Sequence, residues 1–236
     1  MTLARGAAVS LRELGDPALR RPFAGRRRVG LHNIQDALAA LHNALRAVDV
    51  GKGALGISAP QIGSDLRFFL MASPKRFARV IAGGGDDPED KRPIPIFGAG
   101  NVFKYAAIIN PRIVSRSSST SAIIEECLSV PGLRCEVRRS EVIRARFSCM
   151  VPQPLCDEDD DDDDAQQYKL NSYDAVFKGP AAALFQHEHD HLKGRLILDI
   201  ANTVTMSSLA GGSGDGDDEE EAASAAMIAH FFEMNR

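Results

Sequence analysis

The sequence predicts an α+β fold in which antiparallel strands surround a central C-terminal helix that carries the pattern His-Glu-x-x-His. Three observations support this prediction. Small and apolar residues at 181–185 follow Pro180 and lead directly into Gln186–Leu192, as in a buried helix whose first turn tolerates proline. Short apolar runs, typical of strands, alternate with segments rich in glycine and aspartate. One earlier segment, 34–48, is amphipathic with a helical period.

The elements before the final helix are predicted from shorter patterns. The early helix rests on apolar residues at helical spacing, namely Ile34, Leu38, Leu41, Leu45 and Val48. Strands are predicted at Leu66–Met71 and Ala106–Pro111, and the run from Val137 to Phe147 is predicted to form one further strand. Ala54–Gln61 is rich in small residues, which predicts a loop whose backbone can approach a ligand closely.

The chain is predicted to form a single domain over residues 1–236, because this length suits one core. Surface insertions are predicted near 82–100 and 156–166, and a low-complexity segment at 211–221. The acidic run Asp157–Asp164 repels itself, so we expect a solvated loop between two strands there. Met227–Phe232 has helical spacing and is predicted to dock on the body, with partner binding as the alternative.

The composition argues against several classes of protein. With 44% hydrophobic and 25% charged residues, the chain has the balance of a soluble globular protein, and no apolar run is long enough to predict a membrane span. The absence of tryptophan and of aromatic residues interleaved with basic ones argues against a nucleic-acid-binding role. The four cysteines include no C-x-x-C pair, which favours a reducing compartment over a disulfide framework or a zinc ribbon.

The His-Glu-x-x-His pattern predicts a metal site. On a helix, His187 and His191 lie one turn apart on one face, so both imidazoles can bind one divalent ion while Glu188 handles protons. This pattern also occurs by chance on solvated helices, but histidines and acids placed directly after an apolar run are costly to bury without a metal or partners. His189 points to the opposite side and is predicted to be a surface or supporting residue. A hydrolytic metal needs a third protein ligand, for which Cys127 is the candidate thiolate.

Three segments, in this order, resemble the motifs of the peptide deformylases. Ala54–Gln61 is similar to G-x-G-x-A-A-P-Q, Glu125–Ser129 to E-G-C-x-S, and Gln186–His191 to Q-H-E-x-D-H. Ile109–Pro111 and Leu192–Gly194, which flank the second and third motifs, also resemble the family. The resemblance covers roughly residues 10 to 200 and is interrupted by two insertions.

The resemblance implies a metal ion held by Cys127, His187 and His191, with Glu188 as general base and acid. Family members use iron(II) in the cell and tolerate zinc, nickel or cobalt. The implied substrate is the formyl group on the N-terminal methionine of a nascent polypeptide, and the implied products are formate and a free amine. The nascent chain, and with it the ribosome, are the partners to expect.

Further roles follow from the same resemblance. The side-chain amide of Gln61 and the backbone N–H of Leu128 are expected to donate to the developing oxyanion. Gly56 is expected to let its backbone bond the main chain of the substrate. Leu55 and Leu128 are expected to line the methionine pocket.

The chain departs from the family pattern near these residues. Ala54 and Ser58 replace a glycine and an alanine of the first motif, and both are small. Glu126 replaces the glycine beside the candidate thiolate, and either points to solvent or narrows the cleft; we expect reduced or altered activity. Arg134 is expected to position the site by pairing with Glu125.

The sequence leaves three functions open. The first is an active deformylase. The second is a His-Glu-x-x-His peptidase, which needs a different third ligand downstream of the helix, where the acids after Asp199 lie in a glycine-rich tract. The third is a catalytically silent homologue that binds a peptide or a ribosomal partner; Glu126 favours it, whereas the intact metal set and Glu188 oppose it.

The start of the chain bears on its location in the cell. Arginines are concentrated there, at Arg5, Arg12, Arg20, Arg21, Arg26, Arg27 and Arg28. An arginine-rich start is typical of organelle targeting, although a solvated edge is the simpler interpretation. Long acidic and glycine-rich insertions suggest a eukaryotic cell. Because formylated initiation in such a cell takes place in organelles, a mitochondrial location is favoured, with the cytoplasm as the alternative.

Overall fold

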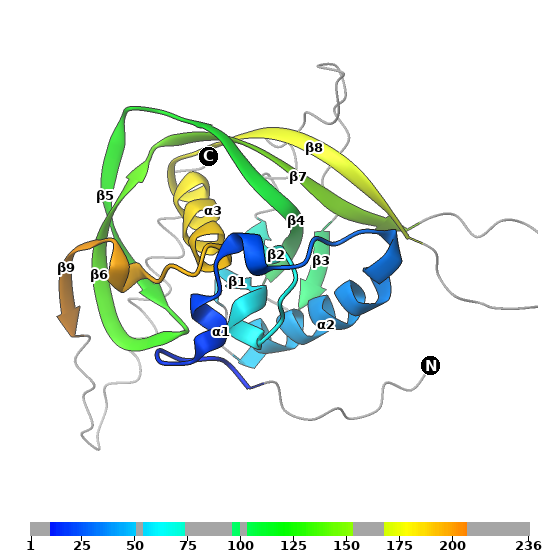
Figure 1. Cartoon of the computed structure of the whole chain (residues 1–236). Coiled ribbons are helices and arrows are strands. Elements are labelled where there is room, and N and C mark those ends of the chain that lie inside the picture. Colours follow the sequence, from blue (N-terminus) through cyan, green and yellow to red (C-terminus); the bar gives the residue numbers. More distant parts are fainter. Residues whose placement is uncertain (1–9, 51–53, 74–95, 100–102, 153–167, 207–236) are drawn as a thin grey trace, which may run out of the picture.

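The structure is a computed structural model that describes residues 10–50, 54–73, 96–99, 103–152 and 168–206 (Figure 1). Its elements, with η for a 3₁₀ helix, are α1 (Pro17–Arg20), η1 (Phe23–Gly25), η2 (Leu31–Asn33), α2 (Ile34–Val50), β1 (Gly56–Ser58), η3 (Ala59–Ile62), β2 (Phe68–Ser73), β3 (Ile96–Ala99), β4 (Phe103–Arg116), β5 (Thr120–Cys127), β6 (Val130–Ser140), β7 (Val142–Pro152), β8 (Tyr168–Lys178), α3 (Gly179–Leu192), η5 (Ile197–Asp199) and β9 (Ala201–Met206).

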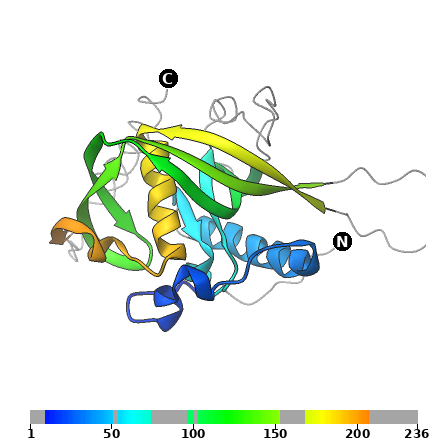
Figure 2. The same cartoon turned by 45° about the horizontal axis from the view of Figure 1, so that its top comes forward.

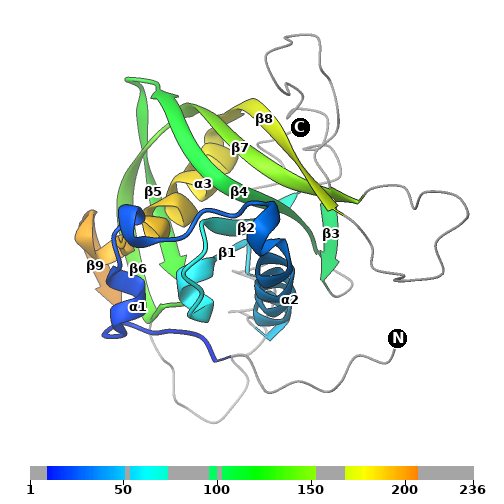
Figure 3. The same cartoon turned by 45° about the vertical axis from the view of Figure 1, so that its right-hand side comes forward.

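The described strands form two antiparallel sheets. The larger sheet has the order β1-β2-β4-β7-β8, with β3 also paired to β4, and the smaller has the order β5-β6-β9. Helix α3 lies between the two sheets and contacts strands of both (Figures 1 and 2). Helix α2 packs beside β1 and β3 (Figure 3). The predicted α+β fold, with antiparallel strands around a C-terminal helix, is confirmed.

Helix α3 is buried on almost every side because sheets flank it. Its apolar residues enter a core formed with β2, β4, β7 and β8. Phe185 belongs to this core, with its ring centroid 5.0 Å from that of Phe69 and 4.8 Å from that of Phe177. The helix begins with Pro180 in its first turn, as the sequence predicts. The histidines that follow are therefore carried into the interior.

The C-terminal end of α3 is fixed by Gly194 and by the side chain of Arg26. The Arg195 N–H bonds the Asp190 carbonyl and the Gly194 N–H bonds the His191 carbonyl, which is the Schellman arrangement. Gly194 has φ of +76°, and a Cβ there would lie 2.7 Å from the Arg20 carbonyl oxygen, so glycine is required. The buried Arg26 side chain donates to the carbonyl of Leu192 at 3.0 Å. The two ends of the histidine segment are thus held in place.

The strand predictions were right in location and wrong in extent. The run 137–147 is not one strand: it reverses at Glu141, so that β6 ends at Ser140 and β7 begins at Val142. β4 is much longer than predicted, and β1, β5, β8 and β9 were not predicted. β1 lies within the segment Ala54–Gln61, which was predicted to be a loop. The acidic run lies between two strands as expected, because β7 and β8 pair antiparallel on either side of it.

Several predictions fall outside the described residues. These are the insertion at 156–166, the low-complexity segment 211–221, the terminal helix near 227–232 and most of the insertion near 82–100, of which β3 is described. Within the described part, arginines at the start belong to the folded body: Arg26 caps α3, and Arg27 pairs with Asp65 at 3.0 Å. No helix in the described ranges is long and apolar enough to cross a membrane.

Candidate metal centre

Cys127, His187 and His191 meet at one point, although they come from β5 and α3. Their candidate ligand atoms all lie within 4.8 Å of one another. The Cys127 Sγ is 3.3 Å from His191 Nε2. Two donors that bind one tetrahedral ion at 2.0–2.3 Å lie about 3.3–3.8 Å apart, so a thiolate and two imidazoles fit a single divalent cation here. The predicted ligand set is brought together as expected.

A buried chain of hydrogen-bonded charged groups, Arg139–Glu125–His187, orients the His187 ring. Its Nδ1 lies 2.9 Å from Glu125 Oε2, and Arg139 donates to both carboxylate oxygens of Glu125 at 2.7 and 2.8 Å. Burial by itself would raise the pKa of Glu125, but the bonds from Arg139 and His187 lower it to about 2. The ionised carboxylate fixes the His187 ring, leaving Nε2 free to bind a metal.

The second imidazole is suited to ligation for another reason. His191 is 1% exposed, and its pKa lies well below the usual value because of burial and because of the nearby His187. A neutral ring offers a lone pair at Nε2 toward Cys127. Its Nδ1 has no hydrogen-bond partner among the described residues.

Glu188 lies beside the metal group with its carboxyl fully enclosed. It is 2% exposed, and burial raises its pKa to about 7, although His187 opposes the shift. Ser58 Oγ donates to the Glu188 carbonyl at 2.7 Å and ties β1 to α3. A Cβ at Gly56 would lie 2.4 Å from Glu188 Oε1, so β1 can approach this carboxyl only through a glycine.

Gln61 has its amide direction fixed by its own turn. Its Oε1 accepts from the Ser58 N–H at 2.7 Å, so Nε2 points the other way. There it lies 3.2 Å from Ser129 Oγ and 3.8 Å from Cys127 Sγ. The amide N–H groups are therefore presented to the metal group. Leu55 and Leu128 are half-buried and pack against the core around α2 and β2.

One prediction about charged side chains near the site was wrong. Arg134 does not pair with Glu125; its Nε lies 2.8 Å from Glu126 Oε1. The reason is strand alternation: Arg134 and Glu126 face solvent, with side chains 44% and 52% exposed, while Glu125 and Arg139 face inward. Glu126 also sits in the register shift of β5 between Glu125 and Cys127. Of the two alternatives for Glu126, the structure shows the solvent-facing one.

His189 is not a ligand, as predicted, but it is not on the surface either. It is 4% exposed, and its ring packs near Phe185 and Phe23, with centroids 6.2 and 5.9 Å away. The helical geometry behind the prediction holds, since His189 points away from the metal. The opposite side of α3, however, is covered by the larger sheet.

Sequence reasoning missed Arg139 altogether. A signal for it exists in β6, where Cys135 and Val137 occupy the inward phase and Arg139 continues it. A charged residue at an inward position of a strand indicates a buried partner. Ser58 and Ser129 were noted only as motif letters, and their hydroxyl contacts to Glu188 and Gln61 depend on three-dimensional placement.

Removing the Arg139 side chain tests the role of the Arg139–Glu125–His187 contact. Arg139→Ala leaves Glu125 buried without its main partner, so we expect a loss of about 3–5 kcal/mol in unfolding free energy. Metal affinity should fall about 10–100-fold, because the orientation of His187 is lost. Arg138→Ala removes the neighbouring, exposed arginine and serves as the control. Urea denaturation measures the unfolding free energy, and competition with a chelator measures the metal affinity. Equal losses in the Arg139→Ala and Arg138→Ala variants would show that the buried contact does not orient His187.

Glu126→Gly tests the departure from the family motif. Because Glu126 faces solvent and is not among the residues with positive φ, we expect turnover of a formyl-methionyl peptide to stay within about twofold of the unmodified chain, as for surface changes in general. A formate-release assay measures this. A large gain in turnover would show that the carboxylate obstructs the cleft.

Comparison with known proteins agrees with this geometry. The family described as polypeptide deformylase matches residues 9–151, which includes Cys127 but ends before the α3 histidines. Peptide deformylase 2 of Nostoc sp. is 30% identical over 198 residues, which cover 82% of this chain and 88% of the relative. The chloroplastic peptide deformylase 1A of Solanum lycopersicum is 26% identical and matches 78% of this chain and 56% of its own length.

Solved structures show the same fold. A peptide deformylase of Acinetobacter baumannii, with Met-Ala-Ser bound, aligns with a TM-score of 0.55 at 23% identity and covers 82% of this chain and 98% of its own. This chain thus combines a Cys-His-His group on β5 and α3 with sequence similarity to peptide deformylases along most of its length. The chain belongs to the polypeptide deformylase family.

Proposed function

We propose that this protein removes the formyl group from the N-terminal methionine of nascent polypeptides and releases formate. The observation that carries this proposal is the meeting of Cys127, His187 and His191 beside the buried carboxyl of Glu188. Family membership supports the same reaction. A bound divalent cation would supply Lewis acidity toward the formyl oxygen and toward water.

Glu188 is the proposed general base and acid. A carboxyl with a pKa of about 7 can take a proton from the attacking water and later return it. In the first step the water oxygen bonds the formyl carbon while its proton passes to Glu188. In the second step the carbon–nitrogen bond breaks, and Glu188 gives the proton to the departing amine nitrogen. Formate and a free N-terminus result.

Two donors are proposed for the developing oxyanion. The Gln61 Nε2 is aimed at the metal group because Ser58 holds the other end of the amide. The Leu128 N–H follows Cys127 directly in the chain. Donors that are fixed before the reaction stabilise the charge without reorganisation, and each contributes on the order of 3 kcal/mol.

The peptide is proposed to lie along β1. This strand is at the edge of the larger sheet, so one side of its backbone has no partner strand among the described elements. Gly56 can bond the main chain of a peptide there, with the formyl group near Glu188. Leu55 and Leu128 would contact the methionine side chain. The Met-Ala-Ser complex of the Acinetobacter relative supports a short peptide as ligand.

The metal is proposed to be iron(II) in the cell, with zinc, nickel or cobalt as substitutes. The donor set supports a transition metal, since one thiolate and two imidazoles are softer than three oxygen ligands. The nascent chain would be met at the ribosome. Arg134 pairs with the exposed Glu126 and is given no part in the proposed reaction.

The decisive experiment compares formate release with peptide cleavage. Formyl-Met-Ala-Ser and its unformylated form are incubated with the anaerobically purified chain, and metal content is measured in parallel. We expect formate from the first peptide, with loss on chelation and recovery on addition of iron(II). Glu188→Gln should retain metal and lose about 10²–10⁴-fold in kcat, while Glu136→Gln, on β6, should not. Internal cleavage would indicate a peptidase, and no product a silent homologue.

A mitochondrial location is proposed for this chain. The chloroplastic relative from a plant supports an organelle over the cytoplasm. Import of the radiolabelled chain into isolated mitochondria, with loss of import when the membrane potential is collapsed, is the expected result. Chain that stays outside and protease-sensitive would contradict it.

A further inference from the structure

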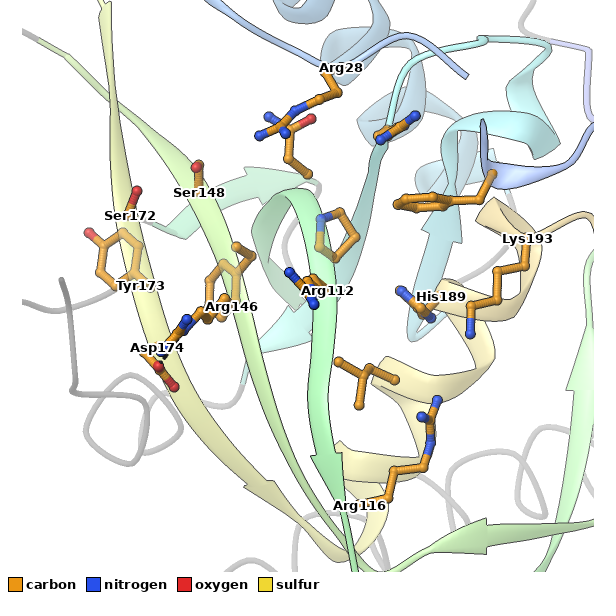
Figure 4. A pocket seen from close by; sticks show the side chains of 16 residues that line it. Arg28, Arg112, Arg116, Arg146, Ser148, Ser172, Tyr173, Asp174, His189 and Lys193 are labelled. Carbon is orange, nitrogen blue, oxygen red and sulfur yellow. Dashed lines mark hydrogen bonds and ion pairs between the residues drawn. The ribbon is translucent and has the colours of Figure 1, made fainter. Parts of the chain in front are cut away.

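A pocket of about 610 Å³ lies on the side of α3 away from the metal centre. Its walls come from β4, β7, β8, the C-terminal end of α3 and the segment that precedes α2 (Figure 4). His189, which points away from His187 and His191, is part of its wall. None of the three candidate metal ligands lines it. The proposed deformylase reaction therefore makes no use of this pocket.

The lining of the pocket is strongly basic, although the whole chain has a formal charge of −4. Its basic side chains are Arg28, Arg67, Arg112, Arg116, Arg146 and Lys193. The one acid, Asp174, already accepts bonds from Arg144 and Arg146 at 2.7 Å each. Arg28, Arg112 and Arg116 form no ion pair with any residue in the described ranges. Three guanidinium groups thus line one hollow with no counter-charge among the described residues, which favours an anionic ligand.

His189 adds a second requirement. Its ring, 4% exposed, lies beside the Pro111 carbonyl, while Nδ1 has no partner within the described part of the chain. With the ring proton assigned to Nε2, on the side of that carbonyl, Nδ1 carries a lone pair. Figure 4 shows this ring between Arg112 and Lys193. A buried acceptor at a pocket wall is costly unless a ligand donates to it.

The backbone of β4 is irregular at this wall. The pairing of β4 with β7 shifts register between Ile109 and Arg112. Asn110 has φ of +51°, and it is the one non-glycine residue with positive φ in the described ranges. Its side chain holds both the N–H and the carbonyl of Val29, at 3.0 and 2.7 Å. Bulges of this kind redirect side chains, and Arg112, which lines the pocket, is the first paired residue after this one.

We propose that this pocket binds a phosphate group that has a hydroxyl donor beside it. The guanidinium groups of Arg112 and Arg116 and the ammonium group of Lys193, which lie around His189 in Figure 4, would hold the phosphate oxygens, and the hydroxyl would donate to His189 Nδ1. Two ligands share this chemistry: monohydrogen phosphate, through its own P–OH, and a ribose phosphate, through the 2′-hydroxyl. A deoxyribose phosphate offers the charge without that donor.

The test titrates the full, metal-loaded chain at low ionic strength by calorimetry. The probes are inorganic phosphate, a short oligoribonucleotide and the deoxyribonucleotide of the same sequence. Arg112→Ala/Arg116→Ala removes two charges from the pocket, and Arg138→Ala/Arg195→Ala removes two exposed charges outside it. We expect the first variant to raise Kd by about tenfold or more, since bonds to charged groups are strong, and the control to stay within about twofold. Added salt should weaken binding.

The outcomes separate the two sources and bound the proposal. Binding of inorganic phosphate identifies the free ion, and preference for the ribo- over the deoxyribo-oligonucleotide identifies a ribose phosphate. Formate release should be equal in both variants, so a failed proposal for the pocket is distinguishable from a failed deformylase function. No binding of any probe, or equal losses in both variants, would overturn the proposal. Binding that appears only after the six aspartates at 159–164 are changed to asparagine would also overturn the proposal.

Discussion

The structure depends on one buried ionic contact, that of Arg139 with Glu125 and of Glu125 with His187. Each of these groups would be too costly to bury alone, and each belongs to a different element, so the contact joins β6, β5 and α3. Because Cys127 lies two residues beyond Glu125 on the same strand, the contact also sets the distance between the thiol and the helix. Arg139 further bonds Asp190 at 2.5 Å, which attaches it to α3 a second time. Gly194 and the Arg26 side chain hold the C-terminal end of α3, and with it the backbone of His191.

The position of α3 between two sheets explains most of the differences from an ordinary metal-binding helix. A helix at the surface has one polar side, whereas this one is enclosed, and several of its polar groups are matched by a specific neighbour. Gln186 bonds Ser140 on β6 through its amide, and Ser58 bonds the backbone at Glu188. Among the described residues, the buried polar side-chain atoms without partners are on His189, His191 and Glu188, which is where ligands and substrates are expected to supply the missing bonds.

Much of the fold and of the metal group could be predicted from sequence. The helical period of α2 and the apolar entry to α3 depend on local pattern, and the ligands lie within motifs. The strand ends could not be predicted as well, because β6 and β7 are joined by a tight reversal at Glu141 and their apolar residues form one continuous pattern. The pairing of Glu125 with Arg139 depends on the register of β5 and β6, where a bulge shifts the alternation. The burial of His189 depends on which sheet covers the far side of α3, and no local pattern reports that.

The pairing of β7 with β8 has a consequence for how the chain can be connected. The two strands pair residue by residue from Val142 with Lys178 to Pro152 with Tyr168, and α3 starts directly after Lys178. The position of the histidines is thus set by the ladder of hydrogen bonds, and the covalent link between the two strands contributes little to it. Loop-closure entropy changes only slowly with the length of such a link. New termini could accordingly be opened between residues 152 and 168, with the original ends joined elsewhere, and a circularly permuted chain would still assemble the same catalytic core.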